Sequence, residues 1–172
     1  MYGIRLLPDW RLPYLIHQSD YNYNLFTSYL LTNAKPIGDS ELNHKKKTML
    51  ENGLAYTATV IVSEENTALR MGSGDMNVFA TPALVALMEN AAMKTVSPHL
   101  KEGETTVGGF IETSHLAPSA IGATIKATAV LTDYKGRKLT FSIEAFEGEK
   151  LVGKATHIRF IVEREKFLNT LS

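Results

Sequence analysis

The sequence of 172 residues contains no cysteine, a single tryptophan and no excess of charge of either sign. The lack of cysteine excludes disulfide bonds, a thiolate nucleophile and a zinc site built on cysteine. Lysine and arginine together number 18, as do aspartate and glutamate. A basic excess or stripe, which nucleic-acid binding requires, is therefore missing. We expect no nucleic-acid partner, no metal and no redox cofactor.

Long hydrophobic runs are also missing. No segment reaches the roughly 18 apolar residues that are needed to cross a bilayer. Pro8, Asp9 and Pro13 interrupt the apolar stretch near the N-terminus, which argues against a signal peptide. These patterns predict a cytoplasmic protein that has no contact with a membrane.

Residues 1–48 differ from the rest of the chain. They contain the only tryptophan and several prolines, and neither a helical nor a strand period is sustained over them. A stretch that is typical of the start of a compact domain begins at Met49. We therefore expect residues 1–48 to form an N-terminal extension of uncertain structure and residues 49–172 to form one domain.

Hydrophobic periodicity after Met49 predicts a strand, a long helix and then four strands. The helix is expected from Thr81 to about Val96, with Thr81 as its N-cap and Pro82 in its first turn. The strands are expected over residues 54–62, 105–115, 121–132, 138–146 and 151–162, with turns at 133–136 and 147–149 and a short helix over 163–171. In the last strand, Val152 and Ile158 are expected to share a face with Phe160 and Val162.

The order of elements favours an α+β architecture. The predicted helix is apolar on nearly all sides, so it must be enclosed. The strands that follow it can pair as an antiparallel meander and curve around the helix. The sequence therefore predicts an antiparallel sheet wrapped around one long apolar helix.

One charged residue interrupts this helix. Between Pro82 and Met93 the only ionisable side chain is Glu89. A carboxylate in an apolar setting is costly unless it is hydrogen-bonded, paired or kept for chemistry. A position on a solvated face of the helix is the alternative, but no other charge defines such a face. Glu89 is therefore the first candidate for a catalytic residue.

The spacing of Glu89 to other polar residues resembles that of the fluoroacetyl-CoA thioesterase-like branch of the hotdog thioesterases. In that family a threonine opens the helix, a glutamate follows eight residues later, and a histidine lies 26 residues beyond the glutamate. Thr81, Glu89 and His115 match these spacings, and Gly108 matches a glycine seven residues before the histidine. The resemblance covers about residues 50–163. It implies the hotdog fold, an acyl-CoA substrate, no cofactor beyond that coenzyme A, and a homodimer, with a higher oligomer left open.

Thioester hydrolysis gives each of these residues a role. The reaction needs a nucleophile, or a base that activates water, and donors that stabilise the developing oxyanion. Glu89 can act as the general base or as the direct nucleophile. His115 can orient Glu89, position water or protonate the leaving thiolate. Thr81 can act beside the free N–H groups of the helix start, or it can serve only as a cap.

Three further residues are candidates for substrate binding from the strands. Gly108 and Gly109 interrupt a strand, which indicates a bulge or a close approach of the backbone to a ligand, or else simple packing against the helix. Arg159 alternates with Ile158 and Phe160, so it faces the opposite side of its strand. There it can contact the ligand or, as we favour, pair with an acid.

Two more candidates for substrate binding, Val78 and Phe79, directly precede the helix and are expected to border the pocket. The fluoroacetyl-specific enzymes carry aromatic lid residues in this region. Here the stretch over residues 72–77 holds none. This departure favours a small or short-chain acyl group in general over fluoroacetyl in particular.

The leading interpretation is therefore an acyl-CoA thioesterase, and two alternatives stay open. A hotdog enoyl-CoA hydratase carries an aspartate five residues before its histidine, where this chain has Phe110, so this alternative is less favoured. The other alternative is a hotdog protein that binds acyl-CoA or an acyl carrier without catalysis. Such a protein has no need of Thr81, Glu89 and His115 as a set.

Overall fold

The computed structural model describes residues 49–171, and the expected N-terminal extension, residues 1–48, lies outside the described residues. The strands are β1 (Ala55–Ile61), β2 (Glu104–His115), β3 (Thr124–Lys135), β4 (Lys138–Glu147) and β5 (Lys150–Glu163). The α-helices are α1 (Thr81–Val96) and α2 (Arg164–Asn169), and the short 3-10 helices are η1 (Glu64–Asn66) and η2 (Ser97–His99).

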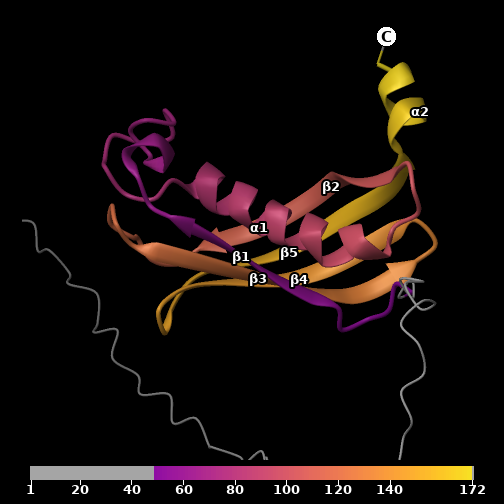
Figure 1. Cartoon of the computed structure of the whole chain (residues 1–172). Helices are drawn as coiled ribbons and strands as arrows, with labels where there is room; N and C mark the ends of the chain where they lie inside the picture. The colour runs from indigo at the N-terminus through magenta and orange to yellow at the C-terminus, as the bar shows by residue number, and fades with distance from the viewer. Residues whose placement is uncertain (1–48, 172) are drawn as a thin grey trace, which may run out of the picture. The chain divides into compact units, whose positions relative to one another are not determined.

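The strands form a single antiparallel sheet in the order β1-β3-β4-β5-β2. The sheet curls around α1, which lies along its concave side (Figure 1). The helix packs chiefly against β1 and β3, so it covers the inner face of β2 less completely. The predicted architecture, a sheet wrapped around one long helix, is confirmed, and β1 and β2 are its two edges.

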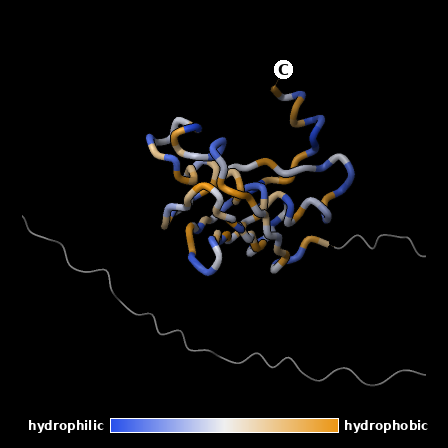
Figure 2. Tube along the Cα trace, turned by 60° about the vertical axis from the view of Figure 1, so that its left-hand side comes forward, coloured by the Kyte–Doolittle hydropathy of each residue, from blue (hydrophilic) through white to orange (hydrophobic). Residues whose placement is uncertain are grey.

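Apolar side chains between the helix and the sheet form the core. Leu84 and Met88 of α1 are fully buried, as are Leu131, Leu139 and Phe141 of the sheet. In Figure 2, apolar and polar residues alternate along the strands, and hydrophilic residues gather at several turns. Full burial of one such side chain stabilises the fold by about 1.5–3 kcal/mol, so this core supplies the rigid support for the site.

The start of α1 differs from the prediction by one residue. Thr81 is the first helical residue, and Ala80 is the N-cap, with no side-chain hydrogen bond to the helix. The Thr81 hydroxyl bonds the ring of His115 instead, so it does not cap the helix. Pro82 lies in the first turn, where its missing N–H costs nothing, and the helix ends at Val96 as predicted.

The turn between β3 and β4 also differs from the prediction. The expected turn over residues 133–136 lies instead at Gly136 and Arg137, because the two strands stay paired up to Lys135 and Lys138. Gly136 has a φ of 60°, a left-handed conformation that glycine adopts without steric cost. The C-terminal helix is confirmed but is shorter than expected, and it runs out from the end of β5 (Figure 1).

β5 turns polar residues toward the helix. The prediction that Val152 shares a face with Ile158 and Phe160 is wrong, because the pairing of β4 with β5 shifts near the start of β5 and inverts the alternation. Val152 faces the core, whereas Phe160 lies on the outer side and is 39% exposed. The inner side carries His157 and Arg159, which are 1% and 7% exposed.

Candidate active site

Glu89 extends from the middle of α1 toward β5. Its Oε1 atom lies 3.6 Å from Arg159 Nη1 and 3.5 Å from His157 Nε2. The Glu89 side chain is 40% exposed, so the carboxylate is neither enclosed in the core nor fully solvated. Glu89 is thus paired with a cation and is still accessible to a small molecule.

Arg159 is held by four contacts. Its Nε donates to Thr106 Oγ1 at 2.9 Å, and its Nη2 donates to the Thr106 carbonyl at 2.8 Å. Its Nη1 donates to His157 Nε2 at 3.1 Å and lies beside Glu89. Burial lowers the pKa of Arg159, and the Glu89 carboxylate offsets part of this effect. The structure therefore pairs Arg159 with an acid, whereas its assignment to substrate binding stays a prediction.

His157 lies between Arg159 and the backbone of β2. Arginine has no acceptor, so Nε2 must accept the Arg159 bond and the ring proton must sit on Nδ1. Nδ1 accordingly donates to the Phe110 carbonyl at 2.6 Å. Burial is the main cause that lowers the pKa of His157, and Arg159 lowers it further; the bond to Phe110 and the charge of Glu89 act in the opposite direction. The ring is therefore neutral at neutral pH.

Sequence reasoning missed His157. The signal that could have found it is its position two residues before Arg159 on the same strand, which places both side chains on one face. The apolar neighbours Ile158 and Phe160 concealed this signal, because apolar residues are usually assigned to the core side of a strand.

The two glycines of β2 form a β-bulge against this group. Gly108 pairs with Arg159, and the pairing then skips Gly109. A Cβ atom on Gly108 would lie 2.7 Å from Glu89 Oε1, and one on Gly109 would lie 2.5 Å from the Phe160 ring. Real Cβ atoms do not approach neighbours so closely, so each glycine makes room for a side chain on one side of the sheet. The expected interruption of the strand is thus a bulge next to Glu89.

Thr81 and His115 form a second group, at the start of α1 and the end of β2. Thr81 Oγ1 lies 2.9 Å from His115 Nδ1, and Phe79 meets the imidazole edge-on, with ring centroids 6.4 Å apart. Burial lowers the pKa of His115, and the nearby backbone of Ala117 offsets part of this effect. His115 Nε2 is buried without a well-formed hydrogen bond to any of the described residues. A neutral imidazole is thus fixed beside the helix N-terminus.

A cavity of about 280 Å³ opens beside Thr81 and His115. Val78 and Phe79 line it, so these two residues lie where the sequence analysis expects them, at the border of a pocket. Leu116 and Pro118 contribute to its wall. The surroundings of the hydroxyl and the imidazole are therefore largely apolar.

The three predicted catalytic residues do not all meet within one chain. Thr81 and Glu89 are eight residues apart on α1, which corresponds to about 12 Å along the helix axis. His115 bonds to Thr81, whereas Glu89 contacts Arg159 and His157. One chain therefore holds two groups, the Thr81 group and the Glu89 group.

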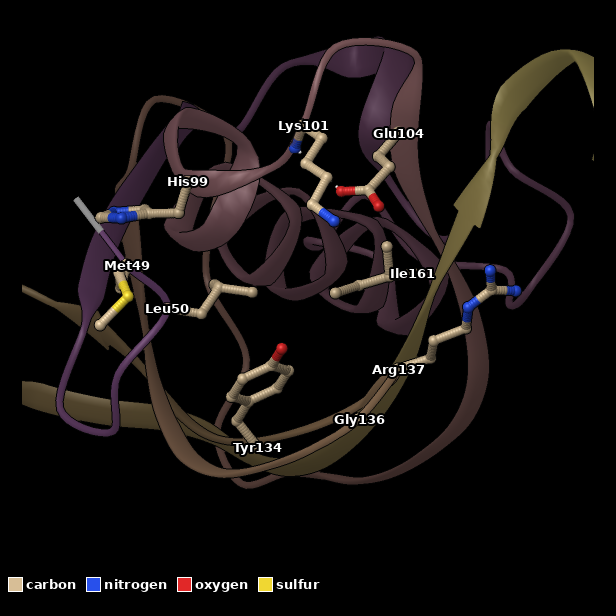
Figure 3. A pocket seen from close by; sticks show the side chains of 9 residues that line it. All are labelled: Met49, Leu50, His99, Lys101, Glu104, Tyr134, Gly136, Arg137 and Ile161. Atoms are coloured by element: carbon tan, nitrogen blue, oxygen red, sulfur yellow. Dashed lines mark hydrogen bonds between the residues drawn. The ribbon is translucent and has the colours of Figure 1, made fainter. Parts of the chain in front are cut away.

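A larger cavity, of about 640 Å³, lies at another end of the inner face. Glu104 and Ile161 in its wall are two residues along their strands from Thr106 and Arg159. In Figure 3 the Tyr134 hydroxyl points toward the middle of this cavity. None of the predicted site residues lines it. Its full lining comprises Met49, Leu50, His99, Lys101, Glu104, Tyr134, Gly136, Arg137 and Ile161.

Two features are absent from residues 49–171. No three histidine, aspartate or glutamate side chains in this range are placed to hold a metal ion together. No helix in the same range is long and apolar enough to span a membrane.

Comparisons with known proteins identify the family to which this chain is similar. The model of a family described as fluoroacetyl-CoA-specific thioesterase matches residues 62–165. A fluoroacetyl-CoA thioesterase from Streptantibioticus cattleyicolor is 38% identical over 90 residues, which are 52% of this chain and 65% of that protein. The match thus spans a little less than two thirds of the length of this relative.

Solved structures share the whole fold. A crystal structure of a variant of the fluoroacetyl-CoA-specific thioesterase FlK matches with a TM-score of 0.69 and 30% identity, over 73% of this chain and 97% of that one. Another FlK variant, solved in complex with acetyl-CoA, matches with a TM-score of 0.67 and 29% identity, over 71% and 96%. A thioesterase superfamily member from Thermus thermophilus matches with a TM-score of 0.66 and 26% identity, over 70% and 90%.

Proposed function

The chain belongs to the family of fluoroacetyl-CoA-specific thioesterases, and we propose that it is an acyl-CoA thioesterase that hydrolyses a small or short-chain acyl thioester. The observation that carries this proposal is the accessible Glu89 carboxylate, which lies against the Gly108–Gly109 bulge. A carboxylate beside exposed backbone provides a base or nucleophile and N–H donors in one place. Acetyl-CoA in a related FlK structure supports the substrate class.

In the proposed reaction Glu89 takes a proton from water while the water oxygen attacks the thioester carbonyl carbon. Alternatively, Glu89 attacks this carbon itself and forms an anhydride that water then hydrolyses. In both routes the C–S bond breaks, and the thiolate of coenzyme A leaves and takes up a proton. Because Arg159 and His157 contact Oε1, Oε2 is the oxygen that we assign to the water or the acyl carbon.

The separation of the Thr81 group from the Glu89 group suggests that two chains complete one site. β2 is an edge strand of 12 residues, and an unpaired edge is a template for pairing with a second copy. Phe110 on this edge is 51% exposed. We therefore propose a homodimer in which the two β2 strands pair antiparallel about a two-fold axis.

The position of this axis follows from the two groups. If it passes through Glu112, so that Glu112 opposes its own copy, it sets the Gly108–Gly109 bulge opposite His115 of the partner subunit. Residues that oppose each other on antiparallel strands point to the same face. Gly108 and His115 are seven positions apart, an odd number that would put them on opposite faces of a regular strand. The extra residue of the bulge restores a common face toward the helix.

Glu89→Gln tests the proposed base, because it keeps the size of the side chain and removes its basicity. We expect the release of free thiol from acetyl-CoA and other short acyl-CoA esters to fall at least about 100-fold, with thermal unfolding unchanged. Glu65→Gln is the matched control, since Glu65 also pairs with an arginine, Arg70, at 3.1 Å on the surface. Full activity of Glu89→Gln would exclude Glu89 as the reacting group.

Mixing two inactive variants tests the shared site. A heterodimer of a Glu89→Gln chain and a His115→Ala chain has one site with both defects and one intact site. Refolding the two variants together should therefore restore about a quarter of the wild-type activity if the chains pair at random. A mixture no more active than its components would show that one chain supplies both residues.

A further inference from the structure

We infer that His157 is a positioning residue for the proposed thioesterase reaction. As a neutral imidazole it ties the bulge of β2 to Arg159, and it thereby fixes both the Gly108–Gly109 backbone and Glu89 Oε1. The role in catalysis rests on the proposed function, whereas the hydrogen-bond arrangement can be tested without it.

Two side chains of β5 hold the bulge from its two ends. Before the bulge, Arg159 donates two hydrogen bonds to Thr106, one to its hydroxyl and one to its carbonyl. After the bulge, His157 donates to the carbonyl of Phe110. A bulge interrupts the ladder of backbone hydrogen bonds and leaves its extra residue unpaired. The side-chain bonds therefore supply support that the backbone ladder does not provide here.

The link between the two anchors is the bond from Arg159 Nη1 to His157 Nε2. Nη1 carries two hydrogens, and Glu89 Oε1 lies 3.6 Å from this same nitrogen. The imidazole and the carboxylate therefore share one end of the guanidinium. The distance from Nη1 to His157 Nε2 is 3.1 Å, which is shorter than the distance to Glu89 Oε1. The bond to the imidazole therefore keeps Arg159 from turning fully toward Glu89.

Two charged side chains of the described residues, Glu89 and Arg159, lie beside His157. Glu89 faces it from α1 and Arg159 from β5, while β2 offers only the Phe110 carbonyl. From β4, the Phe141 ring lies with its centroid 6.5 Å from that of the imidazole. Protonation of Nε2 would remove the acceptor for Arg159 and bring two cations together. The arrangement therefore depends on the Nδ1–H form of a neutral ring.

Two conservative variants separate the two bonds of His157. An Asn amide can reach the place of Nδ1 and keep the bond to Phe110, whereas a Gln amide oxygen can reach the place of Nε2 and accept from Arg159. We expect His157→Asn and His157→Gln each to lower kcat for acetyl-CoA by about 10- to 100-fold, because small displacements of a reacting group are costly. KM should change less than about threefold, because binding of the substrate is not the step affected.

Thr156→Asn is the matched control, since it places the same amide on the exposed side of β5 next to His157. It should retain the wild-type kcat. Thermal unfolding of each variant separates loss of fold from loss of position. Wild-type kcat in both folded His157 variants would overturn the inference.

NMR of the wild-type protein labelled with ¹⁵N-histidine tests the hydrogen-bond arrangement directly. This measurement depends neither on enzymatic activity nor on the folding of a variant. We expect His157 to show the Nδ1–H tautomer at neutral pH, with a proton that exchanges slowly. An Nε2–H tautomer or a charged ring would overturn the inference. If the wild-type protein hydrolyses no acyl-CoA ester, the proposed function fails, and the NMR result still decides whether His157 links the bulge to Arg159.

Discussion

The hydroxyl of Thr81 lies 2.9 Å from Nδ1 of His115, and this bond joins the first residue of α1 to the last residue of β2. The bond to Thr81 holds the imidazole in one orientation. The Phe79 ring, which packs against the imidazole in a T-shaped arrangement, further restricts its rotation. Because Nδ1 is bonded to Thr81, Nε2 is the ring nitrogen that remains for proton exchange in the proposed reaction. Thr81 therefore acts on the reaction through His115 in the proposed site.

Thr81→Val should lower kcat by about 10-fold, because it removes the hydroxyl and leaves the imidazole free to turn. Thr81→Ser keeps the hydroxyl and should retain most of the activity. The measurement is the rate of thiol release from acetyl-CoA. The loss of one exposed hydrogen bond costs about 1 kcal/mol, so both variants should remain folded. Equal rates for Thr81→Val and the wild type would contradict the role of the bond.

Gly108→Ala should lower the activity of the protein by displacing Glu89. Its Cβ atom would lie 2.7 Å from Glu89 Oε1, so the carboxylate has to leave its place beside Arg159. We expect kcat to fall at least about 10-fold, with a change in stability of about 1–3 kcal/mol. Steady-state kinetics and thermal unfolding of the same preparation measure both effects.

Gly109→Ala provides the comparison, since its Cβ atom would meet the Phe160 ring on the other side of the sheet. Replacing Phe160 by alanine removes this obstacle. The double variant Gly109→Ala/Phe160→Ala should therefore be more active than Gly109→Ala alone. No such rescue is expected when Gly108→Ala is combined with Phe160→Ala, and a rescue there would refute the assignment of Gly108 to the Glu89 side.

The fold could be predicted from the sequence because its elements follow hydrophobic periodicity. The apolar stretch from Pro82 to Val96 is long enough to define a helix, and the turns at Gly136 and Gly148 separate strands of alternating pattern. The predicted ends of the strands were less accurate where pairing with a neighbouring strand, rather than the local sequence, decides where a strand ends. The extension of β3 to Lys135 is an example, since only its pairing with Lys138 keeps this residue in the strand.

The site could be predicted only in part. Spacing along the chain identified Thr81 with His115, and the structure joins these two residues. The spacing did not identify His157, because a shift in the pairing of β4 with β5 decides which face of β5 is buried. It also could not reveal that Glu89 and His115 belong to different groups within one chain. Such information is contained in the register of the sheet and not in any local motif.

The larger cavity should not be the site of the reaction, because no acid or base of the Glu89 group lines it. Lys101→Ala and Tyr134→Phe change its wall and leave Glu89 and Arg159 untouched. We expect both variants to hydrolyse acetyl-CoA with a kcat within about twofold of the wild type. A drop of about 100-fold in either variant, without loss of fold, would move the reaction to this cavity.

The folded protein should lose stability in mild acid, because the partly buried His115 and the buried His157 resist protonation. Burial lowers the pKa of both His115 and His157 below the ordinary value of 6.5. In the unfolded chain both rings take up protons as the pH falls through about 6.5, whereas in the folded protein they do so only at lower pH. The unfolded state then binds more protons, so the free energy of unfolding decreases as the pH falls.

The melting temperature of the wild type should therefore be a few degrees lower at about pH 5.5 than at about pH 7.5. His157→Asn has no ring to protonate at this position, so its melting temperature should fall less over the same interval. The lowered pKa of Glu163 acts below its ordinary value of 4.5 and does not contribute in this range. An equal fall in His157→Asn and the wild type would show that His157 is not the group responsible.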